Sequence, residues 1–503
     1  MEQSKTFTDE MKAAYLPKGE SICLGAGMLN GSCFQEAKVN IPLKTLNRHG
    51  LISGATGTGK TKTLQLLAGS LSSKGVPVLL MDIKGDLSGV AKAGEPNSRI
   101  EERQQAIGET FEPEGYPVEL LSLSEEKGVK LRATISEFGP VLLSKILGLN
   151  DTQAGIIAVI FNYCDNNQLP LLDLKDLKKM IQYATNEGKE EIESQYGSIS
   201  SSSAGTILRK VIELEQQGAD HFFGERSFEV NDLVRVDEKG KGYISILRLT
   251  DIQDKPKLFS TFMLSLLAEI YASFPEEGDL EKPKLVIFID EAHLVFEEAS
   301  KELLNQLDAI VKLIRSKGVG IFFCTQSPTD IPSDILSQLG LKVQHALRAF
   351  TAKDRKAIKL VAENYPSSDY YDTASILTSL GIGEAFITAL SEKGVPTPLV
   401  ATLLSAPRSR MDILSPSEID EIVKNSALVQ KYNVEIDSES AYEILNAKLE
   451  KVKTQETVKK TKQEKSMLEK ILGSTTARQI GRTVAREISR GLLGVLGLGG
   501  KRR

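Results

Sequence analysis

The sequence contains no tryptophan, only four cysteines and no long uninterrupted apolar run. The absence of tryptophan excludes no class of function. No apolar run approaches the about 20 residues that span a bilayer, and residues 1–5 lack a secretion signal. The cysteines form no CxxC pair and lie far apart in sequence, which argues against a zinc site and a disulfide framework; they are Cys23, Cys33, Cys164 and Cys324. We therefore expect a cytoplasmic protein.

An excess of positive charge is also missing, because 62 Lys and Arg residues face 67 Asp and Glu residues and the net charge is −5. This balance argues against a surface coated with nucleic-acid-binding charge, although it allows a basic channel inside a ring. The 503 residues, 41% hydrophobic and 26% charged, are enough for a large core and more than one domain. Composition therefore leaves the substrate open.

What the sequence does contain is a complete phosphate-binding loop. Apolar residues precede it and a helical pattern that includes Thr63 follows it, so the segment predicts a strand, a loop and a helix. Its glycines allow backbone angles that turn successive N–H groups toward phosphates, its lysine adds a positive charge, and its last threonine supplies a hydroxyl for Mg²⁺. The alternative is a flexible Gly/Thr turn. The eight residues are Gly54, Ala55, Thr56, Gly57, Thr58, Gly59, Lys60 and Thr61.

A second motif is the apolar run at residues 284–289, which ends in two acids, Asp290 and Glu291. Such a run predicts a buried parallel strand with both acids at its carboxyl end. There Asp290 would hold the Mg²⁺ shell, and Glu291 would orient or deprotonate the water that attacks the γ-phosphate. Taken alone, the pair is also typical of an acidic helix N-terminus. Beside a phosphate loop, the catalytic interpretation is favoured.

Three further polar residues stand at the ends of predicted elements, and each has two interpretations. Gln326 follows the apolar run 320–325, where it either senses the γ-phosphate or only closes a strand. Arg315 ends a predicted helix, as a finger for a neighbouring subunit's nucleotide or as a cation that complements the helix dipole. Asp82 ends the predicted strand at 76–81, where it either orders the metal's water shell or holds the following loop.

Four ordered motifs resemble the HerA/FtsK superfamily of RecA-like motor ATPases: GATGTGKT, LVIFIDEAH, LIRSKGVGIFFCTQSP and VQHALRAFTAKDRKAI. Within that superfamily, the sequence is most similar to uncharacterised bacterial HerA-like proteins of the YjgR type. The resemblance covers about residues 20 to 405 and the arginine-striped tail. It implies an α/β fold, a RecA-like P-loop NTPase core with a mostly parallel sheet, together with ATP and Mg²⁺. It also implies a homo-oligomer, a hexameric ring with the nucleotide between subunits.

The resemblance further implies a role for each candidate site residue. The phosphate loop would bind the triphosphate, and the two acids would hold the metal and the water. By resemblance, Lys60 and Thr61 serve triphosphate and Mg²⁺, Asp290 serves Mg²⁺, Glu291 the water, Gln326 is a sensor, Arg315 is a finger in trans, and Arg348 and Arg355 are further nucleotide or subunit contacts.

One departure from HerA concerns the segment before the phosphate loop. By resemblance, a HerA motor would have a small β-barrel ahead of the phosphate loop. In this sequence only about fifty residues precede that loop. Residues 20–25 and 39–43 predict two strands, which we expect to extend the core sheet. A full barrel is not expected.

Composition along the chain predicts an interrupted core followed by helical segments. The β signals lapse near residue 135 and return at 242–247, and the composition becomes charged and helix-prone after about residue 408. The predicted divisions are a short N-terminal strand segment (1–47), two parts of the ATPase core (48–135 and 236–407) around a helical insertion (136–235), a charged helical or linker region (408–465) and a basic amphipathic tail (466–503).

The tail has an arginine every four residues, with apolar residues on the same spacing two positions later. On a helix these two sets occupy opposite faces. Contact with nucleic acid, contact with an anionic membrane surface, and docking of the apolar face on neighbouring subunits remain alternatives. The arginines are Arg478, Arg482, Arg486 and Arg490.

Two functions follow as alternatives. The first is an ATP-hydrolysing ring motor that translocates or unwinds DNA, which predicts turnover that DNA stimulates. The second is an ATP-driven assembly or remodelling protein that acts on protein or membrane partners without DNA. A non-hydrolysing nucleotide switch is disfavoured because Glu291 is intact. No motif distinguishes ATP from GTP.

Overall fold

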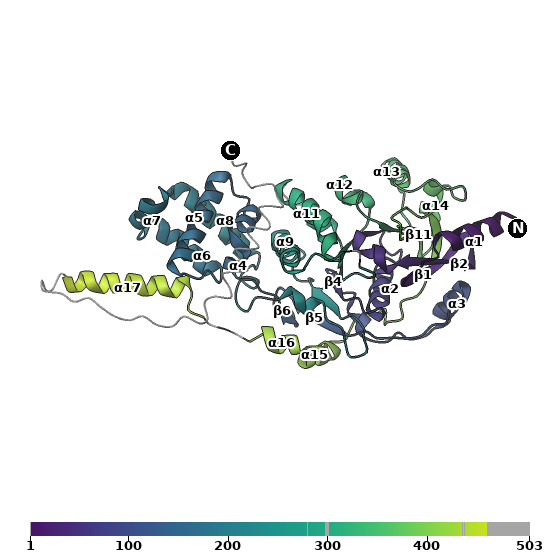
Figure 1. Cartoon of the computed structure of the whole chain (residues 1–503), viewed down its shortest axis with the longest axis horizontal. Coiled ribbons are helices and arrows are strands. Elements are labelled where there is room, and N and C mark those ends of the chain that lie inside the picture. The colour runs from purple at the N-terminus through teal and green to yellow at the C-terminus, as the bar shows by residue number, and fades with distance from the viewer. Residues whose placement is uncertain (1, 279, 297–300, 435, 437, 460–503) are drawn as a thin grey trace.

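The protein is described from a computed structural model, which covers residues 2–278, 280–296, 301–434, 436 and 438–459. A twelve-stranded sheet runs through it in the order β2-β1-β12-β11-β10-β3-β9-β8-β4-β7-β5-β6. The molecule is elongated, with the N-terminal helix at one end of its long axis and a group of helices at the other (Figure 1). The arginine-striped tail predicted from sequence lies outside the described residues.

Eight neighbouring strands of this sheet are parallel, from β10 to β6. Parallel strands need crossover connections, and helices supply most of them, which is the arrangement expected of an α/β protein. The predicted α/β fold with a mostly parallel sheet is therefore confirmed. The strands are β3 (Gly50–Ser53), β4 (Val78–Asp82), β5 (Val118–Ser122), β6 (Val129–Lys130), β7 (Ile244–Arg248), β8 (Leu285–Ile289), β9 (Val319–Thr325) and β10 (Leu341–Gln344).

The other four strands continue the sheet in antiparallel pairs. The two N-terminal strands predicted from sequence are among them, and they extend the core sheet as expected. Their hairpin pairs with β12, and β12 joins it to the rest of the sheet through β11. These strands are β1 (Ser21–Leu29), β2 (Ser32–Pro42), β11 (Glu384–Thr388) and β12 (Val400–Leu404).

Side chains of the central strands alternate between two hydrophobic cores, one on each face of the sheet. In β8, Leu285, Ile287 and Ile289 enter one core, while Val286 and Phe288 enter the other. Because successive side chains point to opposite faces and both faces are covered, the strand reads as a continuous apolar run. This burial on both sides is the physical reason why the strand ending in two acids could be predicted.

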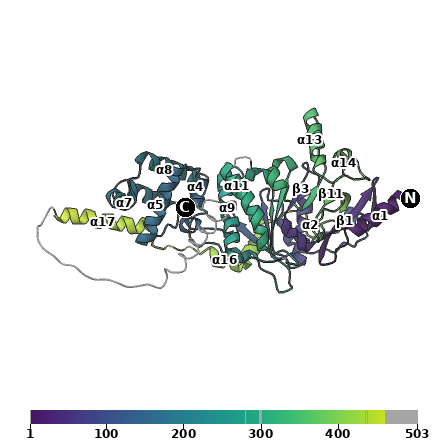
Figure 2. The ribbon, with the colours of Figure 1, turned by 45° about the horizontal axis from the view of Figure 1, so that its top comes forward.

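Helices cover both faces of the sheet (Figures 1 and 2). On one face α9 (Pro256–Ser273) and α11 (Lys301–Ile314) pack together, and a group of five helices extends that core away from the sheet. On the other face α2 (Lys60–Ser73) contributes to the second core. The group, called the helical block below, comprises α4 (Ile135–Ile146), α5 (Asp151–Asn167), α6 (Leu174–Thr185), α7 (Lys189–Tyr196) and α8 (Ser201–Gln216).

The remaining helices lie at the periphery. Helix α1 (Glu2–Ala14) was not predicted from the sequence. It packs Phe7 and Met11 against β2. In the described part of the chain, no helix combines the length and the apolar character that a bilayer crossing requires. The others are α3 (Ser98–Ile107), α10 (His293–Phe296), α12 (Ser333–Leu336), α13 (Ala352–Glu363), α14 (Thr373–Ser379), α15 (Pro416–Asn425), α16 (Ala427–Tyr432) and α17 (Ala441–Lys459).

Candidate active site

The candidate site lies where the carboxyl ends of five adjacent parallel strands meet. Strands β10, β3, β9, β8 and β4 are neighbours in the sheet and run in the same direction. The carboxyl edge of an open parallel sheet is where α/β proteins bind ligands. The phosphate loop, both acids and Gln326 all follow strands at this edge, which is called the nucleotide edge below.

The phosphate loop has the backbone geometry that the sequence predicts. Gly54, Gly57 and Gly59 have φ values of 151°, 78° and 112°, which side chains rarely adopt. A Cβ atom on Gly54 would approach the Cβ of His345 to 2.5 Å, so only glycine fits between strand and histidine. The loop is therefore a tight cradle and not a flexible turn.

Lys60 is folded back onto the loop. It is 8% exposed, and its Nζ donates to the carbonyl oxygens of Gly54 at 2.7 Å and Ala55 at 3.2 Å. Burial lowers the pKa of Lys60, and the nearby Lys84 ammonium lowers it further. An anion at the loop would oppose both effects, because it would give the lysine a charged partner in place of two carbonyl groups.

Helix α2 begins at Lys60, so its first amides point toward the loop. Its N-terminus also carries the positive end of the helix dipole, which favours phosphate. The loop is held from outside, since the Gly383 amide donates to the Thr58 carbonyl at 3.1 Å and Arg103 donates to the Gly383 carbonyl at 3.0 Å. Thr63, one turn into the helix, shares a 2.9 Å hydrogen bond with the Nε2 of His345.

Asp290 and Glu291 follow β8 and are 8% and 5% exposed. Burial, reinforced by the neighbouring Glu291 carboxylate, raises the pKa of Asp290 to about 7. Both carboxylate oxygens of Glu291 lack a hydrogen bond, although Lys84 forms an ion pair with one and His293 Nδ1 lies 3.2 Å from the other. Two adjacent buried acids are an arrangement that a cation would stabilise.

The loop after β4 completes this edge. Asp82 accepts hydrogen bonds from the amides of Gly85, Asp86 and Leu87 at 2.7, 3.2 and 3.1 Å, so it holds the loop, which was the second of its two interpretations. Burial nevertheless raises the pKa of Asp82 to about 6. The loop thereby places Asp86 Oδ2 3.3 Å from the Thr61 hydroxyl.

The edge fits a triphosphate with Mg²⁺. The cradle at Gly54, the helix N-terminus and Lys60 favour phosphate, while Asp290, Glu291 and one unpartnered oxygen of Asp86 favour a cation. Among the described residues no group of three or more His, Cys, Asp or Glu side chains could hold a metal alone. That agrees with Mg²⁺, which binds through one or two protein ligands together with phosphates and waters.

Three other predicted residues lie at or beyond this edge. Gln326 follows β9 directly and is exposed. Arg348 and Arg355 are also exposed, on the loop after β10 and in α13. The Ala55 amide donates to the Ala346 carbonyl at 2.8 Å, so Arg348 stands two residues from the phosphate loop's own backbone contact.

Arg315 lies at the opposite edge of the sheet. It is exposed in the short turn between α11 and β9, beside His49 at the start of β3, where its charge helps to lower the pKa of that histidine. Strand β9 is seven residues long, so about 20 Å separates Arg315 from the nucleotide edge. Arg315 therefore cannot reach the phosphate loop of its own chain.

Comparison with known proteins identifies the family of this chain. The model of the family described as Helicase HerA-like C-terminal matches residues 29–476, which is most of the chain. The chain belongs to this family. Its enzyme class is accordingly that of the P-loop ATPases.

Curated relatives agree with the family. The chain is 26% identical over 384 residues to the DNA double-strand break repair helicase HerA of Sulfolobus acidocaldarius and 25% identical over 367 residues to that of Sulfurisphaera tokodaii. Each match covers 72% of this chain but 66% of the relative. The chain thus spans just under two thirds of the length of these two relatives.

Solved structures show the same fold at low sequence identity. The plasmid coupling protein TrwB in complex with a non-hydrolysable ATP analogue matches with a TM-score of 0.54 and 15% identity, over 81% of this chain and 95% of TrwB. TrwB in complex with ADP and Mg²⁺ matches with a TM-score of 0.53 and covers 81% and 94%. These likenesses establish a RecA-like P-loop fold for this HerA-like chain.

Sequence reasoning missed three residues that support the site. His345 is fully buried against the phosphate loop, where burial and the Lys60 charge lower its pKa to about 4 and keep it neutral. Arg103 and Lys84 act from other elements, α3 and the loop after β4. Lys84 stood near a recognised signal, the strand that ends at Asp82, and His345 lies within the motif VQHALRAFTAKDRKAI, although neither residue was given a role. Arg103 is brought in by long-range packing.

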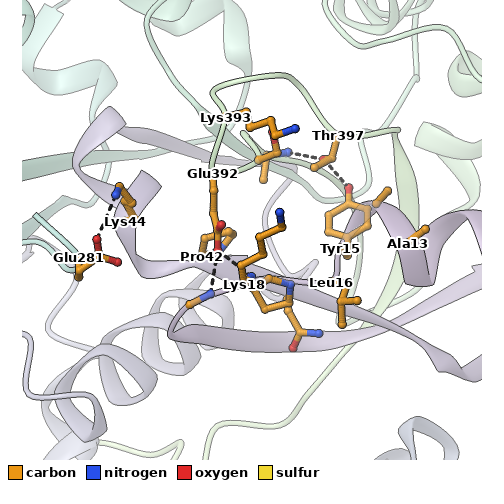
Figure 3. Close-up of a pocket in the computed structure, with 16 residues that line it drawn as sticks. Ala13, Tyr15, Leu16, Lys18, Pro42, Lys44, Glu281, Glu392, Lys393 and Thr397 are labelled. Atoms are coloured by element: carbon orange, nitrogen blue, oxygen red, sulfur yellow. Dashed lines mark hydrogen bonds and ion pairs between the residues drawn. The ribbon is translucent and has the colours of Figure 1, made fainter. Parts of the chain in front are cut away.

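A separate cavity of about 500 Å³ lies near the N-terminal helix of this HerA-like chain (Figure 3). Figure 3 shows Tyr15 directed toward Thr397, and Glu392 directed toward the backbone of Lys18. Its acids are engaged, because Glu392 accepts from the amides of Lys18 and Gly19, and Glu281 pairs with Lys44. The cavity is lined by residues that come directly after β11. Because β11 runs antiparallel to β10, its carboxyl end lies at the opposite end of the strands from the nucleotide edge.

Proposed function

We propose that this HerA-like chain hydrolyses ATP with Mg²⁺ and uses the energy to translocate along DNA or to unwind it. The observation that carries the proposal is the nucleotide edge, where the phosphate cradle after β3 and two buried acids after β8 lie on either side of β9. The relatives named as DNA double-strand break repair helicases support the choice of DNA. We place the chain in the cytoplasm and with bacterial HerA-like proteins of the YjgR type.

In the proposed reaction each residue has a physical task. Lys60 moves from its two carbonyl acceptors to the triphosphate, and the α2 amides hold the phosphate oxygens. Thr61 and Asp290 would hold Mg²⁺, which would supply positive charge to neutralise the charge that develops on the leaving group. Glu291 orients the attacking water and accepts its proton. Gln326, exposed at the end of β9, positions the γ-phosphate or the water.

We further propose that the active unit is a hexameric ring. Arg315 lies about 20 Å from the nucleotide edge of its own chain. If it acts as an arginine finger, it would therefore contact the nucleotide of a neighbouring subunit. Phe350, which is 87% exposed on the loop after β10, lies two residues after Arg348 and five residues before Arg355 in the sequence. Aromatic residues and arginines are enriched in interface centres, which supports a subunit contact here.

The test is the steady-state ATPase rate of the purified protein with double-stranded DNA, with single-stranded DNA and without DNA. We expect DNA to raise the rate and added salt to reduce that stimulation, because DNA binding releases counterions. Lys60→Ala and Glu291→Gln should abolish both basal and stimulated turnover. Turnover without any DNA effect would contradict the DNA part of the proposal while leaving ATP hydrolysis intact.

The second candidate function is ATP-driven remodelling of protein or membrane partners. The net charge of −5 is compatible with it but does not decide the substrate, because a ring motor with a basic channel is compatible with the same balance. Under this alternative, turnover is independent of DNA. Deletion of residues 466–503 would then abolish binding to partner protein or to anionic vesicles without changing the basal rate.

A further inference from the structure

The ion pair between Lys84 and Glu291 joins two loops that meet at the nucleotide edge. Lys84 belongs to the loop after β4, which Asp82 fixes through three backbone amides. Gly85, the next residue, has a φ of 76°, so this turn is built to present its lysine in one direction. The Lys84 side chain remains 40% exposed, whereas the Glu291 side chain is 7% exposed. The pair therefore consists of an accessible cation and a buried base.

Glu291 is held in an unusual state. Its φ is 45°, one of only four positive values among the described non-glycine residues. Neither carboxylate oxygen has a hydrogen bond among the described residues, so its nearby charged partners are Lys84 and, at 3.2 Å, the Nδ1 of His293. Lys84 is the ion-pair partner of this carboxylate, and Lys60 also interacts with it electrostatically, so removing Lys84 would take away its direct charge compensation. Lys84 thus determines where the Glu291 carboxylate lies.

The same lysine is electrostatically coupled to the phosphate loop. Its charge lowers the pKa of Lys60, and Glu291, Asp290 and Asp86 raise the pKa of Lys84 against the opposing effect of burial. A triphosphate bound at Lys60 would bring several negative charges to the edge, and they would attract the Lys84 ammonium away from Glu291. A carboxylate engaged by an ammonium is fixed in position, so opening the pair would free it to orient the attacking water.

We propose that Lys84 restrains Glu291 in the nucleotide-free chain, and that a triphosphate at the phosphate loop opens this ion pair before hydrolysis. Lys84 is then a positioning residue that acts through Glu291. The inference rests on the proposed ATP hydrolysis and adds a step to it. It predicts that the restraint limits the rate at which bound ATP is hydrolysed.

The kinetic test replaces Lys84 with methionine, which keeps the apolar stem and removes the charge. At pH 8 we expect Lys84→Met to raise kcat about threefold or more, with KM changed less than twofold. Lys84→Arg, which preserves the cation, should return kcat toward the original value. The matched control is Lys92→Met, since Lys92 is 41% exposed in a surface ion pair with Glu421 and should leave both constants unchanged. A kcat that stays the same or falls in Lys84→Met would overturn the proposal.

A second measurement does not depend on turnover. Thermal unfolding of Lys84→Met, Glu291→Gln and the double variant gives the coupling between the two residues. We expect coupling without nucleotide, and its loss with a saturating non-hydrolysable ATP analogue and Mg²⁺. Equal coupling in both conditions, or none in either, would contradict the restraint. If the unmodified chain shows no turnover, the proposed function fails, while this cycle still reports whether nucleotide opens the pair.

Discussion

Two buried aspartates show how differently the helical block and the nucleotide edge treat a charge. Asp176 in α6 is 1% exposed and accepts hydrogen bonds from the amides of Leu172, Asp173 and Tyr442 at 2.7, 3.1 and 2.8 Å. Asp290 is 8% exposed, and its pKa is raised to about 7 by burial and by Glu291. The Asp176 carboxylate is used by the fold to hold three amides, whereas the Asp290 carboxylate stands beside a second buried acid.

The helical block supplies the hydrogen-bond partners of its own acids. In the helical block, Asp173 is the N-cap of α6, and Asp176 completes the capping box by accepting from the Asp173 amide. Asp176 also accepts from the Tyr442 amide of α17, which lies beside α6 (Figure 1). Glu191, whose side chain is 39% exposed, accepts from the hydroxyls of Tyr163 and Tyr183 at 2.8 and 3.1 Å. Buried polar groups are normally hydrogen-bonded in this way. The adjacent buried acids at the nucleotide edge, of which Glu291 has no hydrogen bond among the described residues, are therefore a sign of function, because the fold retains them at a cost in stability.

The largest expected effect compares two glutamates, one from each region. Glu291→Gln should reduce the ATP turnover rate by 10² to 10⁴, because a general base contributes about that much. Binding of an ATP analogue should persist, since the phosphate loop is intact. Glu191→Gln should leave turnover per folded molecule unchanged, while the loss of its ion pair with Lys448 lowers the unfolding temperature. Equal turnover losses in both variants would break the distinction between the regions.

The next effect concerns stability in the helical block. Asp176→Ala removes the acceptor of several backbone amides, and we expect a loss of about 3 kcal/mol in the free energy of unfolding. The measurement is denaturant unfolding, with the exposed Asp151→Ala of α5 as control, which should change stability by less than about 0.5 kcal/mol. A small loss at Asp176 would show that α17 docks independently of this carboxylate.

At the nucleotide edge, replacing the buried Asp290 should raise the free energy of unfolding and not lower it. A folded-state pKa of about 7 for Asp290 lies above the usual value of 3.8, so its contribution to stability is fully present below about pH 4 and is lost as the pH rises through 7. Asp290→Asn keeps the neutral form. Without nucleotide, we expect it to be more stable than the original chain by about 2 kcal/mol at pH 8, with the difference shrinking toward pH 4.

Unfolding curves between pH 4 and 8 measure this difference directly. The exposed Asp334→Asn serves as the control, and its effect should not depend on pH. With Mg²⁺ and an ATP analogue present, the order should reverse, because only the aspartate holds the metal. A stabilisation that is constant across the range would show that burial of the Asp290 charge is not its source.

The fold and the site could be predicted from sequence to different extents. Strands buried on both faces, such as β8 with Asp290 at its end, have a continuous apolar signal, and the phosphate loop has a local one. The predicted ATPase class is confirmed by the family. The roles of Glu291, Gln326 and Arg315 stay predictions. Positions at strand ends were predictable because the strands themselves were.

What sequence reasoning missed depends on contacts between distant segments. His345 reaches Thr63 from 282 residues away, and Arg103 reaches Gly383 from 280 residues away. His345 lies within a recognised motif that gave it no role, and Arg103 has no local pattern that marks it. Helix α1 was also missed, because its contacts with β2 and β1 come from Phe7 and Met11 on an otherwise polar helix. Long-range packing of single residues carries no periodicity, so no window of the sequence reveals it.

The smallest expected effects come from two threonines at helix N-termini. Thr134 caps α4 by accepting from the Glu137 amide at 3.2 Å, while Glu137 accepts from the Thr134 amide at 3.2 Å. Thr134→Ala should therefore cost about 1 kcal/mol of stability and leave nucleotide binding unchanged.

Thr61, in the first turn of α2 at the nucleotide edge, donates a 3.3 Å hydrogen bond to Asp86. Thr61→Ala should leave the free energy of unfolding within about 0.5 kcal/mol but weaken Mg²⁺-dependent binding of an ATP analogue about tenfold, as expected when a metal contact is lost. Denaturant unfolding and analogue titration with and without Mg²⁺ measure both quantities on both variants. Both substitutions remove a threonine hydroxyl near a helix N-terminus, since Thr134 is the N-cap of α4 and Thr61 is the second residue of α2. Stability lost in Thr61→Ala together with affinity lost in Thr134→Ala would show that the division between a self-sufficient helical block and a ligand-dependent nucleotide edge is wrong.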